Sequence, residues 1–360
     1  MNLNVLKGLL IILVVVDHND FSRQLIPGFL YGLTFHVVGF MTIPFLRPAH
    51  QLGSREFGDY VFRLYYPFLL VTCALWAVVT VTGTVPLAER LAALGLVLYS
   101  GNAELLKATV NMGLLWFLPS FIALVALRAA MESGGPVLKA AVLALLIALH
   151  PVIGTVARSV ENYLPLGLLP ALYIIPLAYA GVYLHRKLFE PLPVAPAVLV
   201  SLAAYVAVKA VQMSLALSNE VGFSAVADYT EPLALLVNDL EAVAGTLMLF
   251  QLARVRVGAI FALFAMVEPC GKYSMQMYLF HAFVALGLYK ALLLLVPGAP
   301  PLYLFVGSLL ATIVITLGGA AIVMRTAWLK RMIFPRNVHE LVRGAGPVRE
   351  DEKNAVQSRD

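Results

Sequence analysis

Apolar residues along the chain gather in blocks of about 20, and short polar stretches separate these blocks. An α-helix needs about 20 apolar residues to cross the hydrocarbon core of a bilayer, so each block is a candidate transmembrane helix. The pattern predicts an all-α fold, a polytopic membrane helical bundle of about ten transmembrane helices. The predicted spans are residues 3–20, 27–46, 61–82, 112–131, 137–157, 166–186, 193–217, 232–254, 272–296 and 301–328.

Two further segments have helical patterns that do not fit a full span. Residues 87–106 contain Glu89, Arg90 and Glu104, which predicts an interfacial or re-entrant helix. Residues 258–268 are apolar but too short to cross a bilayer, and we predict that they are re-entrant as well.

Both ends of the chain carry segments that differ from the spans. The apolar block 9–16 resembles the core of a signal peptide, but no small-residue cleavage site follows it, which predicts a retained first span. Residues 336–360 are polar and of mixed charge, which predicts a disordered cytoplasmic tail. Residues 1–335 are then a single integral membrane domain.

The composition agrees with a membrane protein. Hydrophobic residues make up 61% of the chain and charged residues only 12%, with a mean hydropathy of +0.88. A soluble domain carries about 25% charged residues. Two cysteines make neither a disulfide framework nor a zinc motif, and no spacing of His, Cys, Asp and Glu suggests a metal site.

The net charge of +5 indicates topology rather than a nucleic-acid partner, because the basic residues lie between the spans. They concentrate in every second connection and at the C-terminal end. Basic loops stay on the cytoplasmic side, so both termini are predicted to be cytoplasmic, with some attraction to anionic lipid. In the internal connections they are Arg47, Arg55, Arg63, Arg128, Lys139, Arg186, Lys187, Arg254 and Arg256.

The first predicted span carries two ionisable residues on one face. Lys7 and His18 are 11 residues apart, which returns the side chain to within roughly 20° of its starting direction, roughly 16 Å along the axis. Ionisable groups inside spans are costly and mark functional sites. His18 is suited to removing a hydroxyl proton. Alternatively, Lys7 extends to a lipid phosphate and His18 lies in an interfacial loop.

Two more histidines fall inside predicted spans. His36 lies in the second span, and His281 lies roughly midway along the ninth. Ser274 is seven residues before His281 and shares a similar helix face. Each histidine has an alternative role as a structural partner that packs or hydrogen-bonds between helices.

Four short motifs follow one another along the spans: Lys7, ten residues and His18; Phe35-His36; Trp-Phe-Leu at 116–118; and Ser274 with Tyr278 and His281. From about residue 3 to 330 the chain therefore resembles the acyltransferase-3 family of membrane acyltransferases. Most of that family has Arg at the first motif position, and Lys-Gly at 7–8 resembles its fucose O-acetylase-like branch. One departure is that the family's second span commonly closes with Phe-Phe-Leu-Ser-Gly, whereas residues 42–46 read Thr-Ile-Pro-Phe-Leu.

The resemblance implies a membrane O-acyltransferase, in a bacterial inner membrane. It would move an acyl group, most often acetyl, from cytoplasmic acyl-CoA to a hydroxyl of a cell-surface or exported glycan or a lipid-linked saccharide. Acyl-CoA would be a donor substrate, with no permanently bound cofactor. The implied catalytic residues are His18 as general base or acyl carrier, Lys7 as a donor contact and Asp17 as an orienting carboxylate, with Asp20 as its alternative. The implied substrate-binding residues are His36, Trp116, Ser274, Tyr278 and His281.

Three other functions use the same residues. A transporter or flippase for lipid-linked saccharides would use them as a substrate path, although no internal repeat is evident. A catalytically inactive family member would bind or scaffold a glycan-assembly complex, although Lys7 and His18 are retained. An acyltransferase acting on a peptide, antibiotic or lipid would keep the chemistry and change the acceptor.

Overall fold

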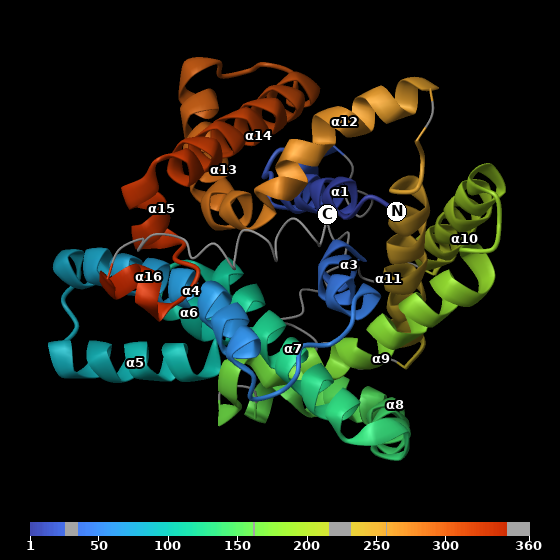
Figure 1. The fold of residues 1–360 in the computed structure, drawn as a ribbon. Helices are drawn as coiled ribbons and strands as arrows, with labels where there is room; N and C mark the ends of the chain where they lie inside the picture. The colour runs from blue at the N-terminus through green and yellow to red at the C-terminus, as the bar shows by residue number, and fades with distance from the viewer. Residues whose placement is uncertain (26–34, 161–162, 216–231, 257, 344–360) are drawn as a thin grey trace.

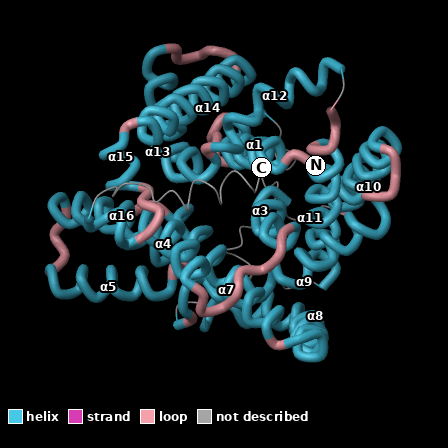
Figure 2. The backbone as a smooth tube through the Cα atoms, viewed as in Figure 1, coloured by secondary structure: helices cyan, strands magenta, loops and turns pink. Residues whose placement is uncertain are grey.

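The computed structural model describes residues 1–25, 35–160, 163–215, 232–256 and 258–343. Within these ranges the chain consists of helices, turns and loops, with no strand (Figure 1, Figure 2). This confirms the all-α class that the hydrophobic pattern predicts.

Eight helical segments of the described residues are long and apolar enough to cross a membrane, and they correspond to eight of the ten predicted spans. Exposed apolar side chains such as Val81, Val137 and Leu294 cover their outer faces, as contact with lipid requires. These helices are α4 (Arg55–Thr82), α7 (Phe117–Ser133), α8 (Gly135–Val160), α9 (Leu168–Leu184), α10 (Val194–Ser214), α11 (Pro232–Leu252), α13 (Ser274–Leu295) and α14 (Pro301–Arg325).

The first predicted span is a shorter helix, α1 (Leu3–Asp17), enclosed by other helices rather than by lipid. Its 15 residues extend about 22 Å, less than the roughly 30 Å of a hydrocarbon core. Leu6 and Leu10 are fully buried. The helix ends before residue 20 because the side chain of Asn19 accepts a hydrogen bond from the Phe21 amide at 3.1 Å, a local bond that competes with the helix.

The second predicted span is also short in the described residues. Helix α3 (Phe35–Thr42) continues into a 3-10 turn (Ile43–Leu46) that contains Pro44, and residues 27–34 lie outside the described residues. In Figure 1, α1 and α3 lie in the middle of the bundle, with α12 to α14 above them, α4 to α6 on the left and α10 and α11 on the right.

Helix α12 (Gly258–Lys272) covers the segment predicted to be re-entrant, and it packs along α1. Two glycines let their backbones approach. A side-chain methyl at Gly271 would overlap the carbonyl of Asn4, and one at Gly8 would overlap the carbonyl of Val267. The Lys-Gly pair of the first motif is therefore a close-packing position as well.

We expect Gly271→Ala to destabilise the protein by about 1–3 kcal/mol, because the added methyl forces α12 away from α1. The matched control is Gly287→Ala in α13, where a methyl meets nothing within 4 Å and helix propensity improves. Thermal unfolding in detergent measures both. An unchanged midpoint for Gly271→Ala would contradict the close contact.

The sequence predicts one interfacial or re-entrant helix over residues 87–106, and the prediction of one helix is wrong, because the segment forms two helices. They are α5 (Leu87–Ser100) and α6 (Ala103–Val110). Gly101 between them has a left-handed φ of 62°, and the Asn102 side chain caps α6 by accepting from the Leu105 amide at 3.0 Å.

Short helices also lie in some of the described connections and near the C-terminal end. They include α2 (Ser22–Leu25) and α15 (Ala327–Ile333). Helix α16 (Val338–Arg343) lies inside the segment from residue 336 that composition predicts to be disordered, and residues 344–360 lie outside the described residues.

Candidate active site

A cavity of about 500 Å³ opens between α1, α4, α7 and α13 and the segment that follows the 3-10 turn. Lys7 of α1 lines it together with Ser274 and Tyr278 of α13. Residues of two motifs that lie far apart in the sequence therefore meet at one site. The rest of the wall is mostly apolar and includes Phe117 and Phe121 of α7.

The charged residues that line the cavity are cationic. They are Lys7, Arg47 and Arg128, with His50 beside them, and no Asp or Glu lines the cavity among the described residues. Each lies at the end of the bundle that the distribution of basic residues predicts to be cytoplasmic. The cavity is therefore suited to an anionic ligand with an apolar part.

Two histidines lie beside each other behind this cavity. The ring of His18, at the C-terminal end of α1, lies 5.3 Å from the ring of His281 in an edge-to-face arrangement. Nδ1 of His18 lies 2.7 Å from the carbonyl of Val14, and Nδ1 of His281 lies 2.6 Å from the carbonyl of Tyr278. A carbonyl only accepts, so each Nδ1 carries the proton and each Nε2 carries the lone pair of a base.

His281 is fully buried, and its Nε2 atom has no hydrogen-bond partner in the described part of the chain. A buried polar atom of this kind is uncommon in proteins and costs free energy unless another molecule pairs with it. The Tyr278 ring adjoins both this histidine and the cavity, since it lines the cavity and its centre lies 5.9 Å from that of the His281 ring, and His281 itself is not a lining residue.

The third predicted histidine joins this group from α3. His36 is 3% exposed, and its Nε2 atom lies 3.9 Å from a carboxylate oxygen of Asp17. Asp17 and His18 follow each other at the end of α1, so residues of three motifs surround that end. Whether Asp17 orients His18 stays a prediction.

Trp116 lies in the wall next to the cavity rather than on its surface. It ends a 3-10 turn (Gly113–Trp116), and its ring lies 6.3 Å from that of Phe117, which lines the cavity. The hydroxyl of Tyr278 donates to the carbonyl of Leu114 in the same turn. This turn therefore holds Tyr278 between the cavity and His281.

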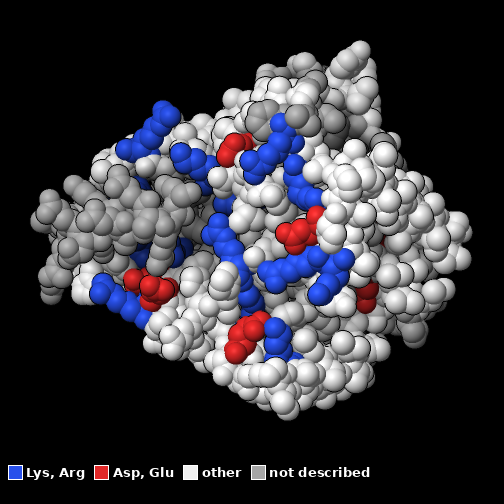
Figure 3. Space-filling view, turned by 45° about the vertical axis from the view of Figure 1, so that its right-hand side comes forward, with Lys and Arg blue, Asp and Glu red and all other residues white. Residues whose placement is uncertain are grey.

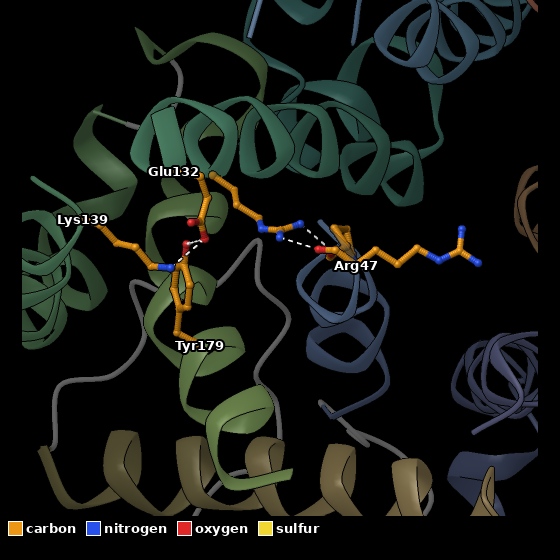
Figure 4. Close-up of polar contacts among 6 residues, drawn as sticks. Arg47, Glu132, Lys139 and Tyr179 are labelled. Atoms are coloured by element: carbon orange, nitrogen blue, oxygen red, sulfur yellow. Dashed lines mark hydrogen bonds and ion pairs between the residues drawn. The ribbon is translucent and has the colours of Figure 1, made fainter. Parts of the chain in front are cut away.

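Arg128 is a site residue that the sequence does not single out. It is 7% exposed and donates to the carbonyls of Pro44 and Arg47, the second at 2.6 Å, while its guanidinium lies 4.9 Å from the Phe45 ring centre. These contacts close the 3-10 turn at the place where the sequence departs from the motif ending in Ser-Gly. In Figure 4 the Arg47 side chain points away from this contact.

Two buried polar groups lie away from the cavity. Lys209 of α10 and Glu241 of α11 form an ion pair of 3.0 Å, with exposed fractions of 2% and 0%. Next to it Gln212 donates to Asn238 at 2.5 Å. Ionisable residues inside two adjacent predicted spans are the signal that could have identified this pair.

A second group joins α8, α9 and α11. Nε2 of His150 lies 2.8 Å from the carboxylate of Asp239, which also accepts from the Tyr173 hydroxyl at 2.5 Å. The rings of His150 and Tyr173 stack at 4.2 Å. His150 lies within α8, which continues to Val160.

A family model described as an acyltransferase domain, that of the acyltransferase-3 family, matches residues 2–323. The protein belongs to the acyltransferase-3 family. The match covers nearly the whole chain and includes the cavity, the three histidines and the motif residues. It makes the protein a membrane acyltransferase. No curated protein and no solved structure matches the chain.

Proposed function

We propose that this acyltransferase moves an acyl group, in the form of acetyl, from cytoplasmic acyl-CoA to a hydroxyl of a cell-surface or exported glycan. The observation that carries the proposal is the cavity that runs from cationic residues to the wall in front of a histidine pair. The Lys-Gly pair at residues 7–8 favours the fucose O-acetylase-like branch, and a bacterial inner membrane fits that assignment.

The cavity's lining supports a donor with an anionic end and a long uncharged arm. Lys7, Arg47 and Arg128 offer positive charge to phosphate, and attraction between charges strengthens where water is excluded. Phe117 and Phe121 offer apolar contact to an acyl-pantetheine arm. In this proposal Lys7 contacts a phosphate or the thioester oxygen.

His18 is the proposed general base. Its Nε2 atom takes the proton of the acceptor hydroxyl, and the oxygen attacks the thioester carbonyl. When the C–S bond breaks, the leaving sulfur takes the proton back from His18, so acceptor ester and CoA thiol are the products. His281 adjoins His18 and, with His36 and Ser274, belongs to the proposed substrate-binding residues.

A path through one bundle explains how the two substrates meet. Acyl-CoA is made in the cytoplasm, where Lys7 and the basic connections are predicted to lie, whereas an exported glycan lies on the other side. His18 and His281 lie deeper along α1 and α13 than Lys7 and Ser274 do. In this proposal only the acyl group passes through the helical bundle, and the rest of the donor stays on the cytoplasmic side of the membrane.

We expect membranes containing the protein to transfer labelled acetyl from acetyl-CoA to saccharide in proportion to the amount of protein. Membranes without the protein, and donor labelled in the adenine ring instead, are the controls. Saccharide movement without consumption of acetyl-CoA would support the transporter alternative and contradict the proposal. Label recovered only in peptide or lipid would keep the acyl transfer and replace the glycan acceptor.

A further inference from the structure

A second hollow, of about 690 Å³, lies next to the cavity and is distinguished by its charge. Its walls come from the segment after the 3-10 turn and from α7, α8 and α9. Five cationic residues and a single carboxylate, Glu132, line it in the described part of the chain. The cationic residues are Arg47, Arg128, Lys139, Arg186 and Lys187.

Two of the five cations already have partners. Lys139 pairs with Glu132 at 2.7 Å, and the same carboxylate oxygen accepts from the Tyr179 hydroxyl at 2.8 Å (Figure 4). The Lys139 ammonium also lies 4.6 Å from the centre of the Tyr179 ring. Arg128 is held by backbone carbonyls. These contacts fix the side chains of one wall, where the charge of Lys139 is balanced by Glu132 and Arg128 keeps its positive charge.

The other three cations have no partner of this kind. The side chains of Arg47, Arg186 and Lys187 make no hydrogen bond or ion pair within the part of the chain that the structure describes. All three are exposed. Figure 3 shows Lys and Arg gathered over the middle of one face of the molecule, with acidic groups beside several of them. Three unpaired cations at one hollow are suited to a ligand with several phosphate charges.

The backbone supports this position for Arg186 and Lys187. They lie in a π-helical turn (His185–Phe189) that continues α9, and such turns are rare and frequent at functional sites. The turn is anchored by Arg254, just after the end of α11, which donates to the carbonyl of Phe189 at 2.7 Å. The two cations are therefore presented by a fixed segment rather than by a loose loop.

The hollow and the cavity adjoin each other along one segment. Arg47, Pro48, Ala49 and Arg128 line both. A ligand that begins at the Tyr278 end of the cavity and extends over the shared segment at Arg47 would end among Arg186 and Lys187. One long molecule with an uncharged arm and a phosphorylated end would match the mostly apolar cavity with its arm and the basic hollow with its phosphates.

We propose that the basic hollow binds the phosphorylated nucleotide end of the acyl-CoA donor, with Arg186 and Lys187 as residues that select CoA over donors lacking the nucleotide. This assignment rests on the proposed function, because it takes the donor to be acyl-CoA. The acyl-pantetheine arm then occupies the cavity, past Arg47.

The test compares binding of CoA and of pantetheine to the full chain in nanodiscs of zwitterionic lipid. We expect Arg186→Gln/Lys187→Gln to weaken CoA binding by roughly 2- to 30-fold, since exposed ion pairs contribute little each. Binding of pantetheine stays unchanged, and the loss in CoA affinity shrinks at high salt. The control is Arg55→Gln/Arg336→Gln, which removes the same charge from exposed residues outside both sites.

Different results overturn the two proposals. Unchanged CoA binding by the Arg186→Gln/Lys187→Gln variant overturns the nucleotide site, as it would if a lipid headgroup occupied the hollow. An equal loss with pantetheine also overturns it, because the effect would then be on the fold. Selective CoA binding with no acyl transfer to any acceptor overturns the proposed function and leaves the nucleotide site standing.

Discussion

Replacing His18 with alanine is expected to lower the rate of acyl transfer by about 10²–10⁴-fold, the usual contribution of a general base. The imidazole has its Nδ1 atom next to the Val14 carbonyl, which leaves Nε2 to take a proton. Because His18 is not among the residues that line the cavity, donor binding should change little. Initial rates over a range of acetyl-CoA concentrations would show a fall in kcat with KM preserved.

His339→Ala is the matched control, since it removes an exposed histidine from α16, outside the cavity. We expect it to keep the wild-type rate. Full activity of His18→Ala would contradict the base assignment and direct attention to His36 and His281. Labelled acetyl held covalently by the wild type without acceptor, and lost in His18→Ala, would make His18 the acyl carrier instead.

The hydrophobic pattern predicts most of the fold because a bilayer imposes one length on every span. Eight predicted spans correspond to long apolar helices. It fails for α1, which ends at Asp17 because Asn19 bonds its local backbone and its amide donates to Ser308 of α14 at 2.8 Å. That second partner lies far along the chain, so no local pattern contains it.

The motifs predict the participants of the site but not their arrangement. Helical spacing places Ser274, Tyr278 and His281 near one face of α13, and the structure brings the first two to the cavity with His281 behind them. Arg128 could not be found this way. Its role comes from carbonyls about 80 residues earlier in the chain, and from the sequence it appears only as a charge that sets topology.

Lys209 and Glu241 were not identified from the sequence, although ionisable residues inside predicted spans are expected to mark functional sites and both residues lie inside such spans. Both are more deeply buried than Lys7, yet neither belongs to a family motif. A buried pair of this kind fixes which faces of α10 and α11 meet, with Gln212 and Asn238 beside it. Its expected effect is therefore on stability first.

We expect Lys209→Met to destabilise the protein by about 3–5 kcal/mol, because it leaves Glu241 as a buried charge without its partner. Unfolding midpoints in denaturing detergent, compared with the wild type, measure the loss. Lys209→Ala would add a cavity to this effect, so Met, which keeps much of the volume, isolates the charge.

The double variant Lys209→Met/Glu241→Leu distinguishes a structural role of the ion pair from a role in the reaction. Removing both charges together is expected to be close to neutral or stabilising, so the double variant should recover most of the loss of the single one. If its activity recovers with its stability, the pair serves to align α10 with α11. A double variant as stable as the wild type but inactive would instead place these charges in the reaction. A single variant that loses no stability would mean that Glu241 has no charge for Lys209 to balance.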